Sequence, residues 1–542
     1  MLETAPGIET AAAAPRRPKR NALSVAAFAG APAVLLLVFG WLGVSAWFRQ
    51  LTLPDEGRYV GVAWEMLRSG HWLVPTLDGL PFFHKPPLFY WMDAASMAVF
   101  GANEWAARLP SLIGATATAW ALYLFLRRWA DTRAATAALV VLITSPGFFA
   151  GAQFANHDML VASWISTSIL LAAHALLSAE AGRRYRLALL GAFACAALGV
   201  LTKGLIGAVL PFLVVASWAL AARRGRALLL LVWPPGLLLF AIVCVPWFAA
   251  MQARHEAFFN YVFVDQQFRR FAQGGFNNPQ PWWFYLPVLA LLTLPWFAWI
   301  WKGVRRETRM HSFADVRLLM WTWILVILLF FSLPSSKLIG YILPVLPPLA
   351  CVLAEGVLVA GQNRPRRMRL LAGIGAMSCL ATVLVVGLFG QTSALPLAQS
   401  MRPLMAPDDR VVMLDRYVYD ASFYLRLDKP ALVASAWSDP GMLTGDNWRK
   451  ELYDASAFDP LRARQVLVEM NELERVLCAP GITWILGDSG SVARFPWLTR
   501  AQHFHDSAKL SVWRWDPKDP AATPCRDSLR AGTTSGKALS LP

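Results

Sequence analysis

The chain has 542 residues, of which 56% are hydrophobic and only 15% are charged. Soluble globular proteins carry roughly 25% charged residues, so the composition excludes an ordinary soluble protein. The formal net charge of +16 would by itself suit nucleic-acid binding. The lysines and arginines, however, are grouped between long apolar runs, so we expect membrane lipids and no nucleic acid as partners.

Eleven apolar runs follow one another along the first two thirds of the chain. Each approaches the ~20 residues that a helix needs to cross about 30 Å of hydrocarbon. The runs are Leu23–Phe48, Ala107–Leu126, Ala134–Ala150, Met159–Leu177, Leu187–Leu201, Leu205–Ala222, Ala227–Phe248, Trp283–Trp301, Val316–Leu333, Leu338–Ala360 and Leu370–Phe389. They predict an all-α polytopic transmembrane domain over residues 23–390.

Six clusters of lysine and arginine predict the topology of these spans. The clusters are Arg16–Arg20, Arg127–Arg133, Arg183–Arg186, Arg223–Arg226, Lys302–Arg309 and Arg364–Arg369. Positive residues accumulate in cytoplasmic loops, so an even number of crossings should separate consecutive clusters. Eleven spans satisfy this condition, with residues 1–22 as a cytoplasmic tail and residues 391–542 outside. The apolar stretch Leu88–Phe100, in the first external loop (49–106), predicts a surface helix or an extra pair of short spans, which gives eleven to thirteen helices.

Residues 391–542 have a different pattern. Short β-rich runs at Arg410–Leu414, Ile482–Leu486 and Leu510–Trp515 flank a helical pattern at Asp459–Leu477. This segment therefore predicts a small α/β domain outside the membrane.

Two aspartates lie where apolar runs meet the outer side. Asp55 follows the first run, and Asp158 precedes the fourth. Asp55 could simply cap a helix. Two acids that reach one face from distant loops also suit a shared site, as a base with an electrostatic partner or as metal ligands. We expect the shared site, with Glu56 as a neighbouring catalytic carboxylate and His84 as a third metal ligand.

Cations and hydroxyls on the outer side predict a site for an anionic lipid phosphate. Lys85 follows His84 and precedes two prolines, which favours a fixed phosphate grip over a lysine that only snorkels. Arg58 and Arg270 add guanidinium donors, although interfacial anchoring explains the aromatic neighbours of Arg270 equally well. The remaining lipid-phosphate candidates are Tyr59, Lys203, Lys337 and Tyr341.

No nucleotide-binding loop and no cysteine-based metal site can be found in the sequence. An enzyme without such a motif needs an activated donor from elsewhere, and a sugar on a lipid phosphate, reached from the bilayer, meets that need. No cofactor is certain, and a divalent metal ion stays open.

The combination of motifs resembles the GT-C superfamily of membrane glycosyltransferases, and most closely the lipid A aminoarabinose transferases, relatives of protein O-mannosyltransferases. The resemblance covers about residues 20–390. The motifs that carry it are Leu53–Tyr59 (LPDEGRY), Phe83–Pro86 (FHKP), Arg108–Pro110 (RLP), Asn156–Asp158 (NHD), Pro334–Leu338 (PSSKL) and Tyr341–Pro344 (YILP).

The resemblance implies a GT-C fold with thirteen transmembrane helices in a bacterial inner membrane and an active site that faces the periplasm. It implies transfer of 4-amino-4-deoxy-L-arabinose from undecaprenyl phosphate to a lipid A phosphate. Attack opposite the leaving phosphate predicts inversion at the anomeric carbon, and we expect a monomer. This reaction would give polymyxin resistance. Asp55 would match the reacting-centre acid, and Lys85 and Arg270, helped by Arg58, would hold the lipid phosphate. His84 departs from the family, where glutamate is common.

Three alternatives stay open, and one of them, an inactive lipid-binding receptor, would tolerate the loss of Asp55. A related GT-C transferase would use a polyprenyl-phosphate sugar to glycosylate a protein or another glycan. A lipid flippase or transporter would show paired halves and charges at the membrane midplane. Here the polar residues gather on one side and a polar domain follows, which favours an enzyme.

The six cysteines divide between the two parts of the chain. Four lie within spans, where they act as small apolar residues: Cys195, Cys244, Cys351 and Cys379. Cys478 and Cys525 lie in the outer tail, where an oxidising compartment favours a disulfide over two unrelated thiols. The loop of about 47 residues that this bridge closes would contribute roughly 3–4 kcal/mol.

Overall fold

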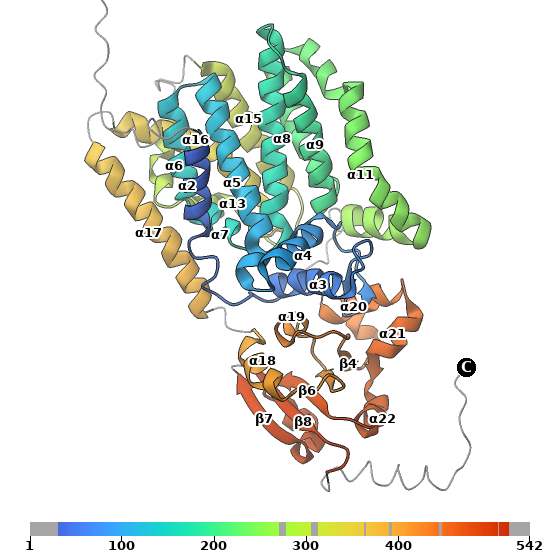
Figure 1. Ribbon diagram of the computed structural model, residues 1–542. Helices are drawn as coiled ribbons and strands as arrows, with labels where there is room; N and C mark the ends of the chain where they lie inside the picture. Colours follow the sequence, from blue (N-terminus) through green and yellow to red (C-terminus); the bar gives the residue numbers. More distant parts are fainter. Residues whose placement is uncertain are drawn as a thin grey trace, which may run out of the picture.

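The computed structural model describes residues 31–269, 278–304, 313–361, 365–389, 393–443, 447–507 and 509–519. Within these ranges the chain forms a large helical bundle and, below it in Figure 1, a smaller domain with a mixed sheet. The predicted fold class, an all-α polytopic transmembrane domain followed by a small α/β domain, is confirmed.

Seven helical segments of the described chain are long and apolar enough to cross a membrane. Five of them are single helices: α5 (Glu104–Trp129), α8 (His157–Glu180), α9 (Arg186–Lys203), α15 (Ala314–Ser332) and most of α17 (Pro365–Phe389). The other two each combine neighbouring elements. Ala227–Arg254 joins η1 (Gly225–Val232) to α11 (Pro234–Arg254), and Ile339–Ala360 joins η5 (Ile339–Val345) to α16 (Leu346–Gly361). The shorter apolar helices α2 (Ala31–Gly43) and α10 (Ile206–Ala221) pack against α5 and α9.

Two further segments are bent. They are α6 (Thr132–Ile143) with α7 (Pro146–Ala152), which meet at 68°, and α13 (Tyr285–Leu292) with η3 (Trp296–Trp299) and α14 (Ile300–Val304), which meet at 107°. Pro146 begins α7 and Pro295 precedes η3, and proline has no N–H to continue a helical ladder. The predicted spans Ala134–Ala150 and Trp283–Trp301 are therefore broken. All eleven predicted runs fall on these helical segments, and the start of the first run lies outside the described residues.

Two helices lie across the end of the bundle that faces the smaller domain (Figure 1): α3 (Asp55–Ser69) and α4 (Leu88–Phe100). Between them, β1 (Thr76–Leu77) and β2 (Leu80–Pro81) form an antiparallel hairpin. Its turn residues Asp78 and Gly79 both have positive φ, as a two-residue turn of type I′ requires. The crosswise position of α4 is that expected of a surface helix. The π-helical segment η2 (Asn260–Arg269) follows α11.

The smaller domain is built on a six-stranded sheet in the order β5-β4-β3-β6-β8-β7. The strands are β3 (Arg410–Leu414), β4 (Leu432–Ser435), β5 (Leu467–Glu469), β6 (Thr483–Asp488), β7 (Gln502–Ser507) and β8 (Leu510–Trp515). β5, β4, β3 and β6 run parallel, and β8 and β7 continue the sheet antiparallel. The three predicted β-rich runs correspond to β3, β6 and β8.

Short helices surround this sheet. They are α18 (Leu395–Met401), η6 (Arg402–Leu404), α19 (Ala421–Leu425), η7 (Pro440–Leu443), α20 (Trp448–Ser456), α21 (Pro460–Val466), η8 (Met470–Glu472), α22 (Leu473–Cys478), α23 (Ser491–Arg494) and η9 (Pro496–Arg500). The single helix predicted over Asp459–Leu477 is wrong. Its middle, Leu467–Glu469, is strand β5, because its backbone pairs with β4 at the sheet edge.

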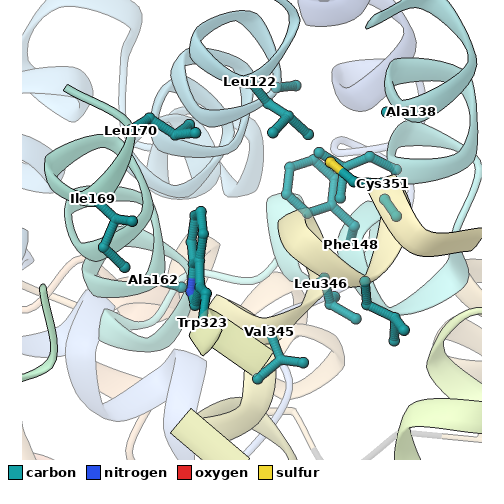
Figure 2. Packing of buried hydrophobic residues seen from close by; sticks show 14 of the residues in the cluster. Leu122, Ala138, Phe148, Ala162, Ile169, Leu170, Trp323, Val345, Leu346 and Cys351 are labelled. Carbon is teal, nitrogen blue, oxygen red and sulfur yellow. The ribbon is translucent and has the colours of Figure 1, made fainter. Parts of the chain in front are cut away.

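The interior of the bundle is packed with large apolar side chains (Figure 2). Trp323 of α15 is fully buried, in the same core cluster as Ile169 of α8 and Phe148 of α7. Leu346 and Cys351 of α16 complete this part of the core. Such packing holds the helix ends, and therefore the side chains at them, in fixed positions.

A second hydrophobic core joins the bundle end to the smaller domain. Val60 and Trp64 of α3 belong to the same buried cluster as Tyr419 and Phe423 of the smaller domain. Two glycines on α3 permit the close approach: a Cβ at Gly57 would lie 3.1 Å from the Asp420 backbone nitrogen, and one at Gly61 3.0 Å from the Tyr419 carbonyl oxygen. Hydrogen bonds also cross the junction: Leu51 N to Tyr424 Oη (3.0 Å), Tyr424 Oη to Glu104 Oε1 (3.0 Å), Trp64 Nε1 to Leu427 O (3.1 Å) and Ala431 N to Asp78 Oδ1 (2.9 Å).

Cys478, at the end of α22, is disulfide-bonded. Cys525 lies outside the described residues, so the pairing of these two stays a prediction. In the denatured, unreduced protein we expect Cys478 to resist thiol labelling and to become reactive after reductant is added. Cys525→Ser should make Cys478 reactive without reductant, with peptide mass spectrometry to locate the label. Labelling of Cys478 in the unreduced wild-type chain would contradict the bridge.

Candidate active site

A polar cavity lies at the junction of the bundle and the smaller domain, and its open space measures about 540 Å³. Its lining residues are Asp55, Arg58, Tyr59, His84, Lys85, Asn156, His157, Asp158, Lys203, Leu338, Tyr341 and Glu451. The eight of these that the sequence predicted as site residues are Asp55, Arg58, Tyr59, His84, Lys85, Asp158, Lys203 and Tyr341. The structure thus brings together side chains from five separate segments of the chain.

Asp55 begins α3 and faces this cavity. Pro54 occupies the N-cap position, and no side chain caps the helix there. The Asp55 carboxylate instead accepts a hydrogen bond from Arg58 Nη2 at 2.5 Å, one helical turn further on. With 44% of its side chain exposed, Asp55 remains accessible to a ligand. The geometry therefore favours the site interpretation of Asp55 over the helix cap.

A second carboxylate reaches Arg58 from the smaller domain. Glu451 of α20 pairs through Oε1 with Arg58 Nη1, and its Oε2 accepts a hydrogen bond from the Tyr419 hydroxyl at 2.7 Å. Asp55 and Glu451 therefore share one guanidinium. Both terminal nitrogens of Arg58 bind carboxylates, so in this structure Arg58 positions Asp55 and Glu451. Its contact with a lipid phosphate stays a prediction.

The ionisation of Arg58 and Tyr59 follows from their surroundings. Burial lowers the pKa of Arg58, but the negative charges beside it, Glu451 and Asp55 among them, outweigh this effect and raise the pKa well above its usual range. Burial raises the pKa of the Tyr59 hydroxyl well above its usual range, although Arg58 opposes the shift. Arg58 therefore stays charged, and Tyr59 stays a neutral hydrogen-bond donor.

Asp158 and Lys203 form an ion pair on another side of the cavity. Asn156 caps α8 by accepting a hydrogen bond from the Asp158 backbone nitrogen at 3.0 Å, which places Asp158 in the first helical turn. Lys203 ends α9, and its Nζ lies 4.5 Å from the centre of the Tyr341 ring. A Cβ at residue 340 would overlap the Asp158 carboxylate, so Gly340 is required for this close packing.

Lys85 and His84 reach the cavity from the loop between β2 and α4. Lys85 Nζ donates to the His84 carbonyl oxygen at 2.9 Å. The His84 ring stacks on Phe82, with the ring centres 4.5 Å apart. The hairpin and the stacked ring thus fix the backbone that carries the lysine.

His157 lies beneath the cavity among aromatic rings. Its ring centre is 4.4 Å from that of Tyr59, 4.8 Å from that of Phe89 and 5.0 Å from that of Tyr90. Only 2% of the residue is exposed, and neither ring nitrogen has a hydrogen-bond partner within the described residues. A buried imidazole with unused nitrogens that lines a cavity is available to a ligand or a water molecule.

Comparisons with known proteins identify the family. The family model for dolichyl-phosphate-mannose-protein mannosyltransferases matches residues 84–249. The undecaprenyl phosphate-α-4-amino-4-deoxy-L-arabinose arabinosyl transferase of Pseudomonas aeruginosa (strain PAO1) is 34% identical over 431 residues, 78% of this chain and 71% of that protein. The chain belongs to this arabinosyl transferase family. The transferase of Erwinia tasmaniensis is 32% identical over 347 residues, 63% of this chain and 62% of that protein.

Solved protein structures have a fold similar to that of this chain. The crystal structure of ArnT from Cupriavidus metallidurans bound to undecaprenyl phosphate is similar with a TM-score of 0.72 and 22% identity. The match covers 89% of this chain and 97% of that one. The structure of the same protein in the apo state gives a TM-score of 0.70 over the same shares. Together with the family model and the 34% identical relative, this shared fold confirms the resemblance to GT-C membrane glycosyltransferases.

Within this arabinosyl transferase, Glu56 has a structural role, and its assignment as a catalytic residue is wrong. It is fully buried and pairs with Arg49 and with Arg108, whose Nε lies 2.9 Å from Oε1. The Thr52 and Ala155 backbone nitrogens each donate to it at 2.8 Å. Burial raises its pKa, but the two arginines outweigh this and hold the pKa well below its usual range. All its acceptor sites face these partners, and the residue does not line the cavity.

Two other predicted phosphate contacts are not found in the cavity. Lys337 is 3% exposed, and its Nζ donates to the Pro334 carbonyl at 2.5 Å and to the Gln280 carbonyl at 3.0 Å. Its assignment to the lipid phosphate is therefore wrong, because backbone carbonyls take its hydrogen bonds. Arg270 lies outside the described residues, and its role stays a prediction.

The predicted set of metal ligands is also wrong. Among the described residues, no three histidine, cysteine, aspartate or glutamate side chains gather where they could hold a metal ion together. Asp55 is turned toward Arg58, and Asp158 toward Lys203. Asp55, Asp158 and His84 thus line the same cavity without converging on one point.

Three polar residues that line the cavity were not among the predicted site residues: Asn156, His157 and Glu451. Asn156 and His157 stood in a motif already singled out, next to Asp158. Glu451 carries no comparable signal, because it lies in a helix of the smaller domain and reaches Arg58 from 393 positions away in the sequence.

Proposed function

We propose that this chain transfers 4-amino-4-deoxy-L-arabinose from undecaprenyl phosphate to a phosphate of lipid A, at the periplasmic face of a bacterial inner membrane. The modified lipid A carries less negative charge, which gives resistance to polymyxin and other cationic peptides. The observation that carries the proposal is the polar cavity, with its lysines and carboxylates, next to an apolar one. We expect the enzyme to act as a monomer.

The apolar neighbour suits a polyprenyl chain. A second, smaller hollow shares Asp158, Lys203 and Tyr341 with the polar cavity. Its other lining residues are Val161, Ile165, Ile206, Phe331, Gly340 and Pro344. The first isoprene units of the donor would lie against these apolar side chains, while the phosphate stays in the polar cavity beside Lys203.

Phosphate stabilisation is the main task of the lysines. An oxygen of the lipid A phosphate forms a bond with the anomeric carbon as the bond from that carbon to the undecaprenyl phosphate oxygen breaks. The electron pair leaves with the undecaprenyl phosphate, and Lys85 and Lys203 stabilise the negative charge that develops there. Attack opposite the leaving phosphate inverts the anomeric carbon. Because the acceptor is already an anion, no proton has to be removed from it.

Asp55 would act on the sugar. As the leaving phosphate departs, the anomeric carbon gains positive charge, and a carboxylate beside it stabilises that charge. Asp55 is the most exposed of the three acids in the cavity, with 44% of its side chain accessible against 16% for Asp158 and 12% for Glu451. This exposure is why we assign the role to Asp55.

A protein acceptor is the second candidate, because the matching family model describes protein mannosyltransferases. The test is mass spectrometry of lipid A from cells with and without this protein, and of lipid A incubated with the purified enzyme and the aminoarabinose donor. We expect one added aminopentose on lipid A only when the enzyme is present. Unmodified lipid A together with a glycosylated periplasmic protein would instead support the second candidate.

Replacement of Lys85 should weaken donor binding. A hydrogen bond to a charged group contributes roughly 1.5–3 kcal/mol, so we expect Lys85→Ala to lower the affinity for undecaprenyl phosphate about tenfold or more. Binding is measured with the full chain in nanodiscs. Lys429→Ala, at an exposed lysine of the smaller domain, is the matched control and should bind as the wild type does. Equal affinity of the Lys85 variant and the wild type would remove Lys85 from the phosphate site.

A further inference from the structure

His157 lines the cavity, yet its polar atoms make no hydrogen bond to the protein. The residue is 2% exposed, and neither ring nitrogen has a hydrogen-bond partner within the described residues. Buried polar side chains are nearly always hydrogen-bonded, because a donor or an acceptor left without a partner costs free energy. In either protonation state an imidazole offers at least one N–H donor. A ligand that fills the cavity can supply the missing partner.

Aromatic packing alone does not require an imidazole at this position. The His157 ring contacts the rings of Tyr59, Phe89 and Tyr90 at interplanar angles of 79°, 40° and 80°. A phenyl ring would fill this aromatic surround without burying two polar atoms. The backbone is fixed as well, because His157 begins α8 and Asn156 caps that helix. The imidazole is therefore held in place before any ligand binds, as a binding residue should be.

The position of His157 points to the sugar of the lipid-linked donor. Asp55 and Tyr59 are four residues apart on α3, so their side chains lie on the same face of that helix, and both line the cavity. The His157 ring centre lies 4.4 Å from that of Tyr59. In the proposed mechanism Asp55 faces the anomeric carbon. A pentose ring held at Asp55 therefore lies next to the pair formed by Tyr59 and His157.

A pentose also matches these surroundings in its chemistry. Its C–H groups suit the neighbouring aromatic rings, and its hydroxyls can accept a hydrogen bond from an imidazole N–H or donate one to the other ring nitrogen. The proposed sugar has such hydroxyls at C2 and C3. A phosphate carries full negative charge, for which an ammonium group is the stronger partner.

We propose that His157 is a specificity-determining residue that hydrogen-bonds the hydroxyl at C2 or C3 of the donor pentose, and this inference rests on the proposed function. A site in which the substrate hydroxyl satisfies a buried polar atom rejects an analogue that lacks this hydroxyl, because the atom then stays unpaired. His157 thus selects the sugar by its hydroxyls, whereas Asp55 acts on the reacting carbon.

The test uses three synthetic sugar donors: undecaprenyl phosphate carrying 4-amino-4-deoxy-L-arabinose, and the 2-deoxy and 3-deoxy analogues of this compound. Transfer to lipid A by the full-length enzyme in nanodiscs gives kcat/KM for each. His157→Phe keeps an aromatic ring and removes both nitrogens. Each sugar donor is compared between the wild type and the variant, so differences in intrinsic reactivity cancel. We expect a loss of about tenfold or more on the parent compound, and of at most about twofold on the analogue that lacks the contacted hydroxyl.

Two further variants and a binding measurement complete the design. His71→Phe makes the same substitution at an exposed histidine outside the cavity and should use all three sugar donors as the wild type does. His157→Gln retains an N–H donor and a carbonyl acceptor and should recover part of the rate on the parent compound. His157→Phe should bind undecaprenyl phosphate, which has no sugar, with wild-type affinity.

The outcomes distinguish this inference from the proposed function. An equal loss on all three sugar donors would overturn the sugar contact and leave His157 a packing residue, while the proposed function stands. Weaker binding of undecaprenyl phosphate by His157→Phe would also overturn it, because the imidazole would then contact the phosphate. A wild-type enzyme that transfers none of the three sugars would refute the proposed function itself. If His157→Phe does not fold, His157→Leu is measured in the same way with the same expected losses.

Discussion

Asp55→Asn should lower the rate of aminoarabinose transfer by at least about a hundredfold while leaving the protein folded. The substitution keeps the shape of the side chain and removes the negative charge that faces the anomeric carbon in the proposed mechanism. Electrostatic stabilisation of this kind typically contributes about 10²–10³ to the rate. The measurement is single-turnover transfer with the purified chain, together with mass spectrometry of lipid A from cells that express the variant.

The control is Asp428→Asn. Asp428 is an exposed acid on the same side of the molecule, and it pairs with Arg68 away from the cavity. We expect wild-type transfer from this variant and equal thermal stability for both. Lipid A modified at the wild-type level by Asp55→Asn would remove Asp55 from the reaction.

Glu56→Gln, only one position further along, should have a different effect: loss of the folded protein. Glu56 is fully buried and neutralises Arg49 and Arg108, so its loss leaves two guanidinium groups without a buried counter-charge. Removing one partner of a buried ion pair costs roughly 3–5 kcal/mol. We expect a large drop in the midpoint of thermal unfolding in detergent and little protein in the membrane fraction.

Glu474→Gln is the matched control, since it makes the same glutamate-to-glutamine substitution at an exposed position. Its unfolding midpoint should equal that of the wild type. A Glu56→Gln enzyme that is stable and inactive would show instead that this carboxylate takes part in catalysis, and the structural role described above would be wrong.

The contrast between these neighbours shows what the sequence can and cannot predict. The arginine clusters and the lengths of the apolar runs were enough to place Asp55, Asp158 and Lys203 on one side, and the structure brings them to one cavity. The pattern could not separate Asp55 from Glu56. Consecutive residues on a helix point about 100° apart, and only the packing of α3 decides which one faces the cavity and which one is buried.

The remaining differences also come from tertiary packing. Lys337 was expected to bind phosphate because it is a cation on the outer side, but backbone carbonyls take its hydrogen bonds. The contact between Glu451 and Arg58 depends on how the smaller domain packs against α3, through Gly57 and Gly61. No periodicity within either segment carries that information. Fold class, by contrast, follows from composition and length alone.

The contact between Arg58 and Glu451 also has a consequence for how the enzyme is made. The ribosome produces the helices of the bundle long before it reaches α20, and Glu451 completes the cavity only after the smaller domain has folded against α3. A nascent chain, or one truncated by a premature stop codon before α20, would place its helices in the membrane and still lack a complete site. The lining of the cavity is thus complete only once the smaller domain has been made and has folded against α3.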